Sequence, residues 1–368
     1  MTWEPSRLDD QAHLSKGDPG GMLPEVASSA AQVRSAYRTA LEAGVSRLTS
    51  IGRPRAVVVA GMGVAGIAGD LLAAVCGPGS PAPVITVSSH RLPGWVGAAD
   101  LVVLVSPEGR TEETLEVAAQ AVRRGCGLLA VAPAGSPLEA FARQASGVFV
   151  PVAAGGQSRA KLWSLVVPLL MAATELGLAK ADQELFESTA TTLEDIANRC
   201  RPSSDSFINP GKTLALELAE SIPMIWGSSP VTAVAAHRLA CQLQENAHYP
   251  ALWGELPEAA QNQLAVIDGP LAQRDIFADT AERALRLVVL RDTEEHPQVA
   301  KVRDAAVRMA EDRGVQVTEL VAEAGQPLLR LASLIELGDY ASAYLALGYG
   351  LDPTPVTAVT ELKARISL

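Results

Sequence analysis

The chain has 368 residues, of which 48% are hydrophobic and 4% aromatic, and its formal net charge is −11. This length suits two domains of ordinary size, with cores built from aliphatic side chains. The acidic balance, without a run of Lys or Arg, excludes a general nucleic-acid binder, although backbone amides and a few basic residues can still hold an anion locally.

The four cysteines are far apart and form no CxxC pair, which favours reduced thiols over a metal site or a disulfide framework. The N-terminal residues MTWEPSRLDD lack the basic start and apolar core of a signal peptide. No uninterrupted apolar stretch reaches membrane-spanning length. We therefore expect a soluble, cytoplasmic protein without a membrane partner.

Residues 1–30 are polar, contain Gly and Pro, and are expected to form a loosely packed arm. Short β-branched runs then alternate with helical patterns. The predicted strands are 55–61, 83–87, 101–105, 127–132 and 147–152, and the predicted helices are 31–48, 66–75 and 111–125. Strands alternating with helices predict a doubly wound parallel sheet, here in a domain spanning 31–200.

Two apolar helices, 161–178 and 182–201, lead to a turn-rich segment at 201–211 that marks the domain junction. The alternation then restarts. The predicted strands are 222–226, 264–267, 285–290 and 315–321, and the predicted helices are 231–244, 299–313, 328–347 and 355–366. The expected fold class is α/β, with two doubly wound, flavodoxin-like domains, the second spanning 201–368.

Glycines follow the first strand in GMGVAGIAGD, residues 61–70. Here backbone amides at Gly61 and Gly63 could approach a phosphate or sugar, or the glycines could only allow tight strand–helix packing. No acidic residue ends a second strand as a dinucleotide site would require. In SPEGRTEET, residues 106–114, the hydroxyls of Ser106 and Thr111 could hold an anion, or Thr111 could simply cap a helix.

A third stretch, QENAHYPA at 244–251, places Glu245 and His248 three residues apart at a helix end, where they could share a face. A carboxylate there could be a general base or only a solvated side chain.

Together these stretches resemble the bifunctional phosphoglucose/phosphomannose isomerase family, which has two sugar-isomerase (SIS) domains. The family pattern reads approximately GMGGSAIGGD, SYSGNTEET, NENAK-PA, LPE--HNE and a tail close to LGD--S-YLA---G-DPTPV--I--LK. This chain offers GMGVAGIAGD, SPEGRTEET, QENAHYPA, LPEAAQNQ and LGDYASAYLALGYGLDPTPVTAVTELK in the same order.

The resemblance implies metal-independent isomerisation of a sugar 6-phosphate through a cis-enediol, without a cofactor, in a homodimer whose active sites lie at the dimer interface. Glu245 falls on the glutamate that moves the proton between C1 and C2. Ser106 and Thr111 fall on phosphate-binding residues. Arg159, in GGQSRA, falls on an arginine that would stabilise the enediolate, and Lys363 falls on a lysine that would reach the site from the terminal helix.

The departures from the pattern lie at loops that would touch the ligand. Gln261 replaces the histidine that assists ring opening, and His248 stands nearby as a substitute or as a surface residue. Glu108 replaces a phosphate-loop serine, and Arg110 replaces an asparagine and could grip an anion. Val64-Ala65 replaces GGS in the glycine loop, so a hydroxyl is lost.

Three hypotheses follow from these residues. The chain is a working isomerase with Glu245 as base, a non-catalytic SIS protein that binds a sugar phosphate, or a protein whose Glu108 and Arg110 recognise another anion or an amino sugar.

Overall fold

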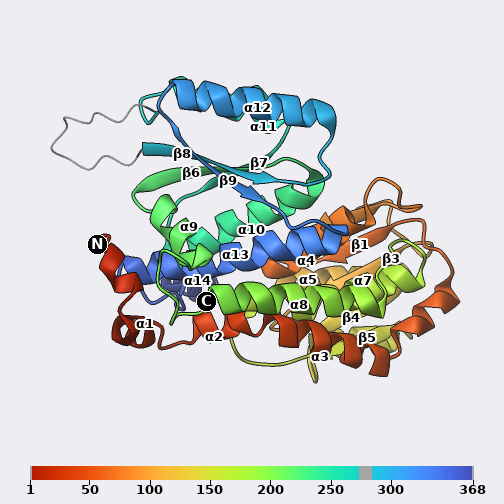
Figure 1. Cartoon of the computed structure of the whole chain (residues 1–368). Coiled ribbons are helices and arrows are strands. Elements are labelled where there is room, and N and C mark those ends of the chain that lie inside the picture. The colour runs from red at the N-terminus through yellow and green to blue at the C-terminus, as the bar shows by residue number, and fades with distance from the viewer. Residues whose placement is uncertain (1, 273–283, 367–368) are drawn as a thin grey trace. The chain divides into compact units, whose positions relative to one another are not determined.

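A computed structural model of the chain describes residues 2–272 and 284–366 (Figure 1). The chain forms two compact units. The N-terminal unit comprises residues 28–194, and the C-terminal unit comprises residues 195–368 together with 1–27. The boundary between them falls inside helix α8 (Gln183–Arg199). Each unit has its own parallel sheet.

The sheet of the N-terminal unit has the strand order β2-β1-β3-β4-β5. Its strands are β1 (Val57–Ala60), β2 (Val84–Val87), β3 (Leu101–Val105), β4 (Gly127–Pro133) and β5 (Val148–Val152). All residues of β1 and β3 are buried, as expected of aliphatic runs in a parallel sheet covered on both faces. This order gives a topological switch point between β1 and β3, where open α/β sheets bind ligands at the strands' carboxyl ends.

Helices cover this sheet. They are α3 (Ser29–Glu42), α4 (Val64–Cys76), α5 (Glu112–Arg123), α6 (Pro137–Gln144) and α7 (Leu162–Glu175), with 3-10 turns η2 (Val45–Ile51) and η3 (Ser158–Ala160). Helices α5 and α6 contribute Val117 and Leu138 to an aliphatic core with Val102 of the sheet. Helix α7 packs against α3 and α4.

The sheet of the C-terminal unit has the order β7-β6-β8-β9, with all neighbours parallel. Its strands are β6 (Ser221–Gly227), β7 (Leu252–Glu255), β8 (Ala284–Arg291) and β9 (Gln316–Val321). The helices after residue 200 are α9 (Pro210–Leu218), α10 (Pro230–Ala247), α11 (Ala259–Asn262), α12 (Pro297–Asp312), α13 (Pro327–Gly348) and α14 (Thr357–Ile366), with η4 (Gln263–Asp268). Helix α10 packs along α13.

The expected fold class, α/β with two doubly wound parallel sheets, is confirmed. The strand predicted at 264–267 is wrong, because these residues form η4. The side chain of Gln263 holds this segment, since its Oε1 accepts from Trp226 Nε1 at 2.6 Å and its Nε2 donates to the Trp253 carbonyl at 2.9 Å. The strand beside β6 is β7, which the sequence pattern did not predict.

The N-terminal residues are not a loosely packed arm. They form η1 (Pro5–Leu8), α1 (Gln11–Gly17) and α2 (Met22–Ala27), and Leu8, Leu14 and Met22 are buried. The ammonium of Lys212, which is fully buried, donates to the carbonyls of Pro202 and Ser204 at 2.8 and 2.7 Å and lies 3.4 Å from Asp9. This ion pair ties the N-terminal segment to the rest of its unit.

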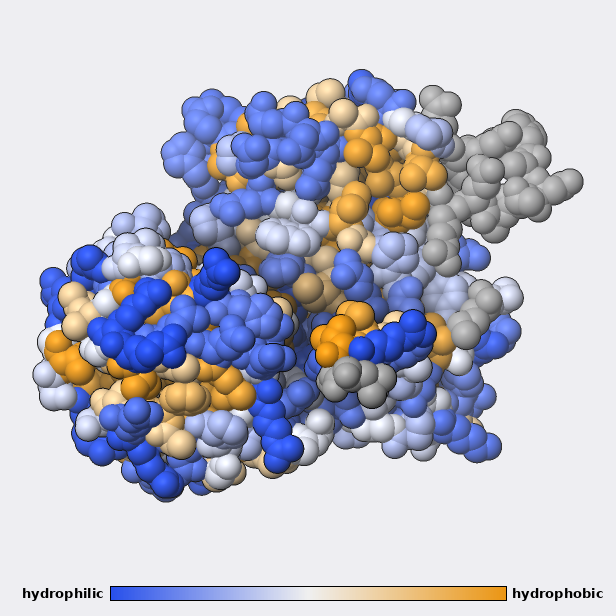
Figure 2. Space-filling view, turned by 180° about the vertical axis from the view of Figure 1, so that it is seen from behind, coloured by the Kyte–Doolittle hydropathy of each residue, from blue (hydrophilic) through white to orange (hydrophobic). Residues whose placement is uncertain are grey.

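None of the described helices is long and apolar enough to cross a membrane. On the face shown in Figure 2, hydrophilic residues are interspersed with smaller apolar patches. The exposed large apolar side chains include Phe207 and Ile208 before α9, and Leu362 and Ile366 on α14.

Candidate functional site

The glycines after β1 shape the switch point of the N-terminal unit. Gly63 is the N-cap residue of α4 with φ +56°, a conformation that side-chain-bearing residues rarely adopt. A Cβ at Gly61 would lie 2.6 Å from Cβ of Ala65. Both glycines therefore have a backbone reason to be here, and Gly63 remains exposed enough for its amide to meet a ligand.

The later glycines of this stretch serve packing. A Cβ at Gly69 would lie 2.6 Å from Oγ1 of Thr86 and 3.0 Å from Val59. Val64 belongs to the glycine loop that the resemblance places against the ligand, but its side chain is buried, with 8% of its surface exposed. The side chain that Val64 adds at this position therefore packs into the core of this unit.

The loop after β3 brings Ser106 and Thr111 together. The Ser106 hydroxyl is 2.9 Å from Oγ1 of Thr111, and it accepts the Gly109 amide at 2.9 Å. Thr111 is the N-cap residue of α5, yet its side chain makes no capping hydrogen bond. The capping interpretation of Thr111 is thus not supported, and its hydroxyl serves the loop instead.

A pocket of about 490 Å³ opens beside this loop, within the N-terminal unit. Its polar lining comprises Glu108, Arg110, Ser136, Ser158 and Lys161. Glu108 turns toward Ser158, whose hydroxyl donates to Oε1 at 3.3 Å. The Lys161 ammonium donates to the Ala153 carbonyl at 2.8 Å and to the Gly155 carbonyl. The pocket thus combines two cations with one carboxylate and is suited to an anionic sugar.

Arg159 lies in η3, between the pocket residues Ser158 and Lys161, and is partly buried. Ser158 and Lys161 were not among the predicted site residues. A signal for them was present, because the polar sequence GGQSRAK directly precedes an apolar helix.

In the C-terminal unit, Glu245 lies in the last turn of α10 and is partly exposed. The end of this helix is anchored against α13. The side chain of the next residue, Asn246, donates through Nδ2 to Ser342 Oγ at 2.9 Å, and Asn246 is fully buried. The buried Asn246 thus anchors the backbone beside Glu245, and positioning of this kind is what a general base requires.

His248 does not continue the helical face of Glu245. It is the C-cap of α10 in the left-handed conformation, with φ 51° and ψ 37°, and its Nε2 lies 3.2 Å from the Pro355 carbonyl in the tail. Gln261 is exposed in α11, and Lys363 is exposed in α14. The roles of these residues in a reaction stay predictions.

The described residues contain no group of three or more His, Cys, Asp or Glu side chains able to hold a metal ion.

The chain is similar in sequence to known sugar-phosphate isomerases. A model of the bacterial phospho-glucose isomerase C-terminal SIS domain matches residues 207–366. A bifunctional phosphoglucose/phosphomannose isomerase of Caldicellulosiruptor bescii is 32% identical over 311 residues, covering 84% of this chain and 89% of that protein. The chain belongs to the bifunctional phosphoglucose/phosphomannose isomerase family. A family member from Aquifex aeolicus is 28% identical over 314 residues, covering 85% of this chain and 90% of that protein.

Solved structures support the SIS fold of this family member. A glucose-6-phosphate isomerase from Chlamydia trachomatis matches with a TM-score of 0.70 at 14% identity, covering 93% of this chain and 77% of that one. Tagatose-6-phosphate ketose/aldose isomerase from Escherichia coli matches with a TM-score of 0.68 at 12% identity, covering 90% and 95%. At these identities the likeness shows the fold alone.

Proposed function

We propose that this family member is an aldose–ketose isomerase that interconverts glucose 6-phosphate or mannose 6-phosphate with fructose 6-phosphate, without a cofactor. The observation that carries the proposal is the place of Glu245, which by the sequence resemblance falls on the family's base and which lies in the last turn of α10 beside the buried Asn246. The similarity to the isomerase of Caldicellulosiruptor bescii supports it.

In the proposed reaction, the Glu245 carboxylate removes the proton from C2 of the open-chain aldose and returns it to C1, while a hydroxyl proton moves between O1 and O2. The cis-enediol between these steps develops negative charge, which Arg159 and Lys363 would stabilise. Ser106, Thr111, Arg110 and the amides near Gly61 and Gly63 would bind the phosphate. His248 and Gln261 would contact the sugar during ring opening.

We also propose a homodimer in the cytoplasm. No residue of α14 is buried within the chain, and its apolar side chains Leu362 and Ile366 are 58% and 74% exposed, which suits a second copy. The four cysteines are unpaired, as is usual for cytoplasmic proteins.

The test is isomerisation of glucose 6-phosphate and mannose 6-phosphate by the purified chain and by Glu245→Gln. We expect the variant to lose about 100- to 10,000-fold in turnover, the usual contribution of a general base. Glu184→Gln, a matched change at an exposed position of α8, should keep wild-type turnover. If the wild type turns over no faster than Glu245→Gln, the isomerase proposal fails.

A non-catalytic sugar-phosphate-binding protein is the second candidate. Gln261 cannot donate a proton near neutral pH as the family's histidine does, and Glu108 adds a carboxylate to the pocket. Saturable binding of glucose 6-phosphate in calorimetry, without turnover, would support this function. Binding of an amino sugar in preference to a sugar phosphate would indicate that Glu108 and Arg110 changed the specificity.

A further inference from the structure

The two sheets follow the same winding order, so their strands correspond. β1 and β3 of the N-terminal unit occupy the places that β6 and β8 occupy in the C-terminal unit. The C-terminal unit therefore has its own switch point, between the ends of β6 and β8, where an open parallel sheet would bind a ligand.

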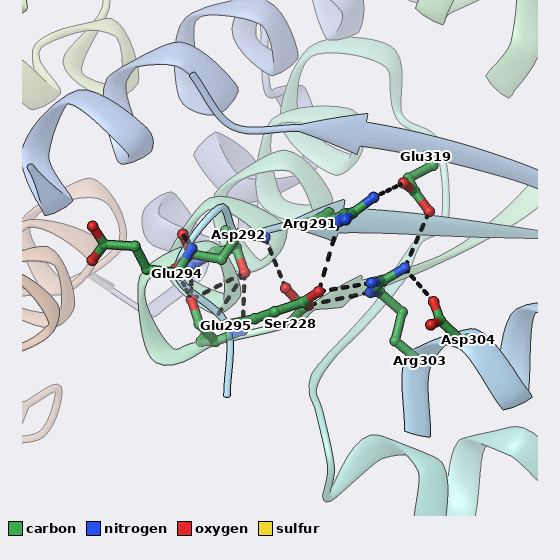
Figure 3. Close-up of polar contacts among 10 residues, drawn as sticks. Ser228, Arg291, Asp292, Glu294, Glu295, Arg303, Asp304 and Glu319 are labelled. Carbon is green, nitrogen blue, oxygen red and sulfur yellow. Dashed lines mark hydrogen bonds and ion pairs between the residues drawn. The ribbon is translucent and has the colours of Figure 1, made fainter. Parts of the chain in front are cut away.

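The carboxylate of Asp292, the first residue after β8, lies at this switch point (Figure 3). Oδ2 accepts the hydroxyl of Ser229 at 2.5 Å, and Oδ1 accepts the amide of Glu294 at 3.1 Å. The Asp292 amide donates to Ser228 Oγ at 2.8 Å. Ser229 is also the N-cap of α10, so the carboxylate lies at the positive end of an 18-residue helix.

A guanidinium completes the set. Arg330 of α13 places its Nε 3.2 Å from Oδ1 of Asp292, and its Nη1 contacts Glu294. Only 2% of Asp292 and 4% of Arg330 is exposed. A hydroxyl, a backbone amide, a helix N-terminus and an arginine are the donors that proteins use to bind phosphate and other oxyanions.

The surrounding loop is held by further ion pairs. Arg303 of α12 contacts Glu295 at 2.7 Å and also reaches Asp304 and Glu319 (Figure 3). With Glu294 bound to Arg330 and Glu295 bound to Arg303, both carboxylates that follow Asp292 are engaged. The loop therefore presents Asp292 to the switch point from a fixed backbone.

The corresponding position in the N-terminal unit is different. There the first residue after β3 is Ser106, which is neutral, and its hydroxyl supports a loop beside an open pocket. A neutral hydroxyl does not repel a bound anion and can donate a hydrogen bond to it, whereas a carboxylate repels it.

We infer that the switch point of the C-terminal unit is an oxyanion site that the chain occupies with its own Asp292 carboxylate. Asp292 substitutes for the phosphate of a ligand and links α10, β8 and α13. External phosphates and carboxylates are excluded from this site as long as Asp292 is present.

The test is chemical rescue. In Asp292→Ala, the donors of Ser229, Glu294 and Arg330 remain and the carboxylate is gone. Thermal unfolding of wild type and variant is followed while sodium formate is titrated, with sodium chloride at equal ionic strength as the salt control. We expect Asp292→Ala to unfold at a lower temperature than wild type. Formate should raise its midpoint in a saturable way, by about 3–6 °C at ten times the dissociation constant.

Asp292→Asn is the matched variant, because its side chain fills the same space without charge. We expect it to be destabilised and not to respond to formate beyond the wild type. Equal formate shifts in wild type and Asp292→Ala, or a larger shift in Asp292→Asn than in Asp292→Ala, would overturn the inference. If Asp292→Ala does not fold, Asp292→Ser carries the same titration, with the same outcomes deciding.

Discussion

A buried ion pair between α10 and α13 offers a sharp test of how the C-terminal unit is held together. The Arg238 guanidinium donates through Nε to Oδ1 of Asp339 at 3.0 Å and through Nη2 to Oδ2 at 2.6 Å. Only 2% of Arg238 and 3% of Asp339 is exposed. We predict that Asp339→Ala strongly destabilises this unit, because it leaves a guanidinium in the core without its carboxylate.

The size of the effect follows from this burial. Removing one partner of a buried pair costs about 3–5 kcal/mol, whereas replacing both partners with apolar residues of similar volume is often close to neutral. Asp339→Ala should therefore lower the free energy of unfolding by about 3–5 kcal/mol. The double variant Arg238→Met/Asp339→Leu should recover about 2 kcal/mol or more of that loss.

Equilibrium urea unfolding provides the measurement, followed by far-UV circular dichroism and by tryptophan fluorescence, to which the buried Trp226 of the same unit contributes. The free energies are compared in a double-mutant cycle with Arg238→Met. A loss below about 1 kcal/mol for Asp339→Ala, or a double variant destabilised by the sum of both single changes, would refute the reasoning.

Three further predictions concern the N-terminal unit and the thiols. Gly69→Ala should lower the free energy of unfolding by about 1–3 kcal/mol because its Cβ would lie 2.6 Å from Thr86 Oγ1, whereas Gly79→Ala, where no atom lies within 4 Å, should not. The Arg55 guanidinium holds the pKa of Asp100 below its usual value. The charged carboxylate is therefore favoured in the folded state. Its stabilisation is present above the unfolded pKa of about 4 and is lost as the pH falls through the folded value. Wild type should consequently lose stability more steeply below pH ~4 than Asp100→Asn in acid unfolding. Burial raises the pKa of the Cys200 thiol to about 12, so a thiol reagent at pH 8 should label Cys200 in urea but not in the native protein, and rapid native labelling would contradict this.

The sequence predicted most of the fold because buried parallel strands are nearly continuous aliphatic runs. The strand 101–105 agrees with β3 residue for residue, because a short Val/Leu run between turn signals favours a buried strand. The errors arose where an apolar run was short, or where a residue type common in turns is also common at the start of a helix. The apolar run at 264–267 is too short to show a helical or a strand periodicity. Its conformation is decided by the hydrogen bonds of the Gln263 side chain. The Asn209-Pro210 pair suggested a turn, yet Asn209 caps α9, with Pro210 in its first turn.

The site was predicted less completely. The hydroxyl pair of Ser106 and Thr111 follows from a turn between a strand and a helix, and the structure brings the two together. The environment of Val64 and the partner of Glu108 could not be predicted, because each depends on contacts with residues distant in the sequence. The position of His248 depends on the tail, whose Pro355 carbonyl it contacts.

The long sequence match in the tail has a structural reason, because several of its residues are buried and bind other parts of the C-terminal unit. Asp339 and Ser342 of the LGDYAS sequence are buried and bind Arg238 and Asn246 of α10. Tyr344 of the same helix donates its hydroxyl to the Cys200 carbonyl at 2.5 Å. These residues would be retained in a catalytic or a non-catalytic member alike, because they pack α13 against α10. The buried residues of the tail therefore account for the packing of α13 on α10, and the comparison of wild type with Glu245→Gln tests the choice between catalysis and binding.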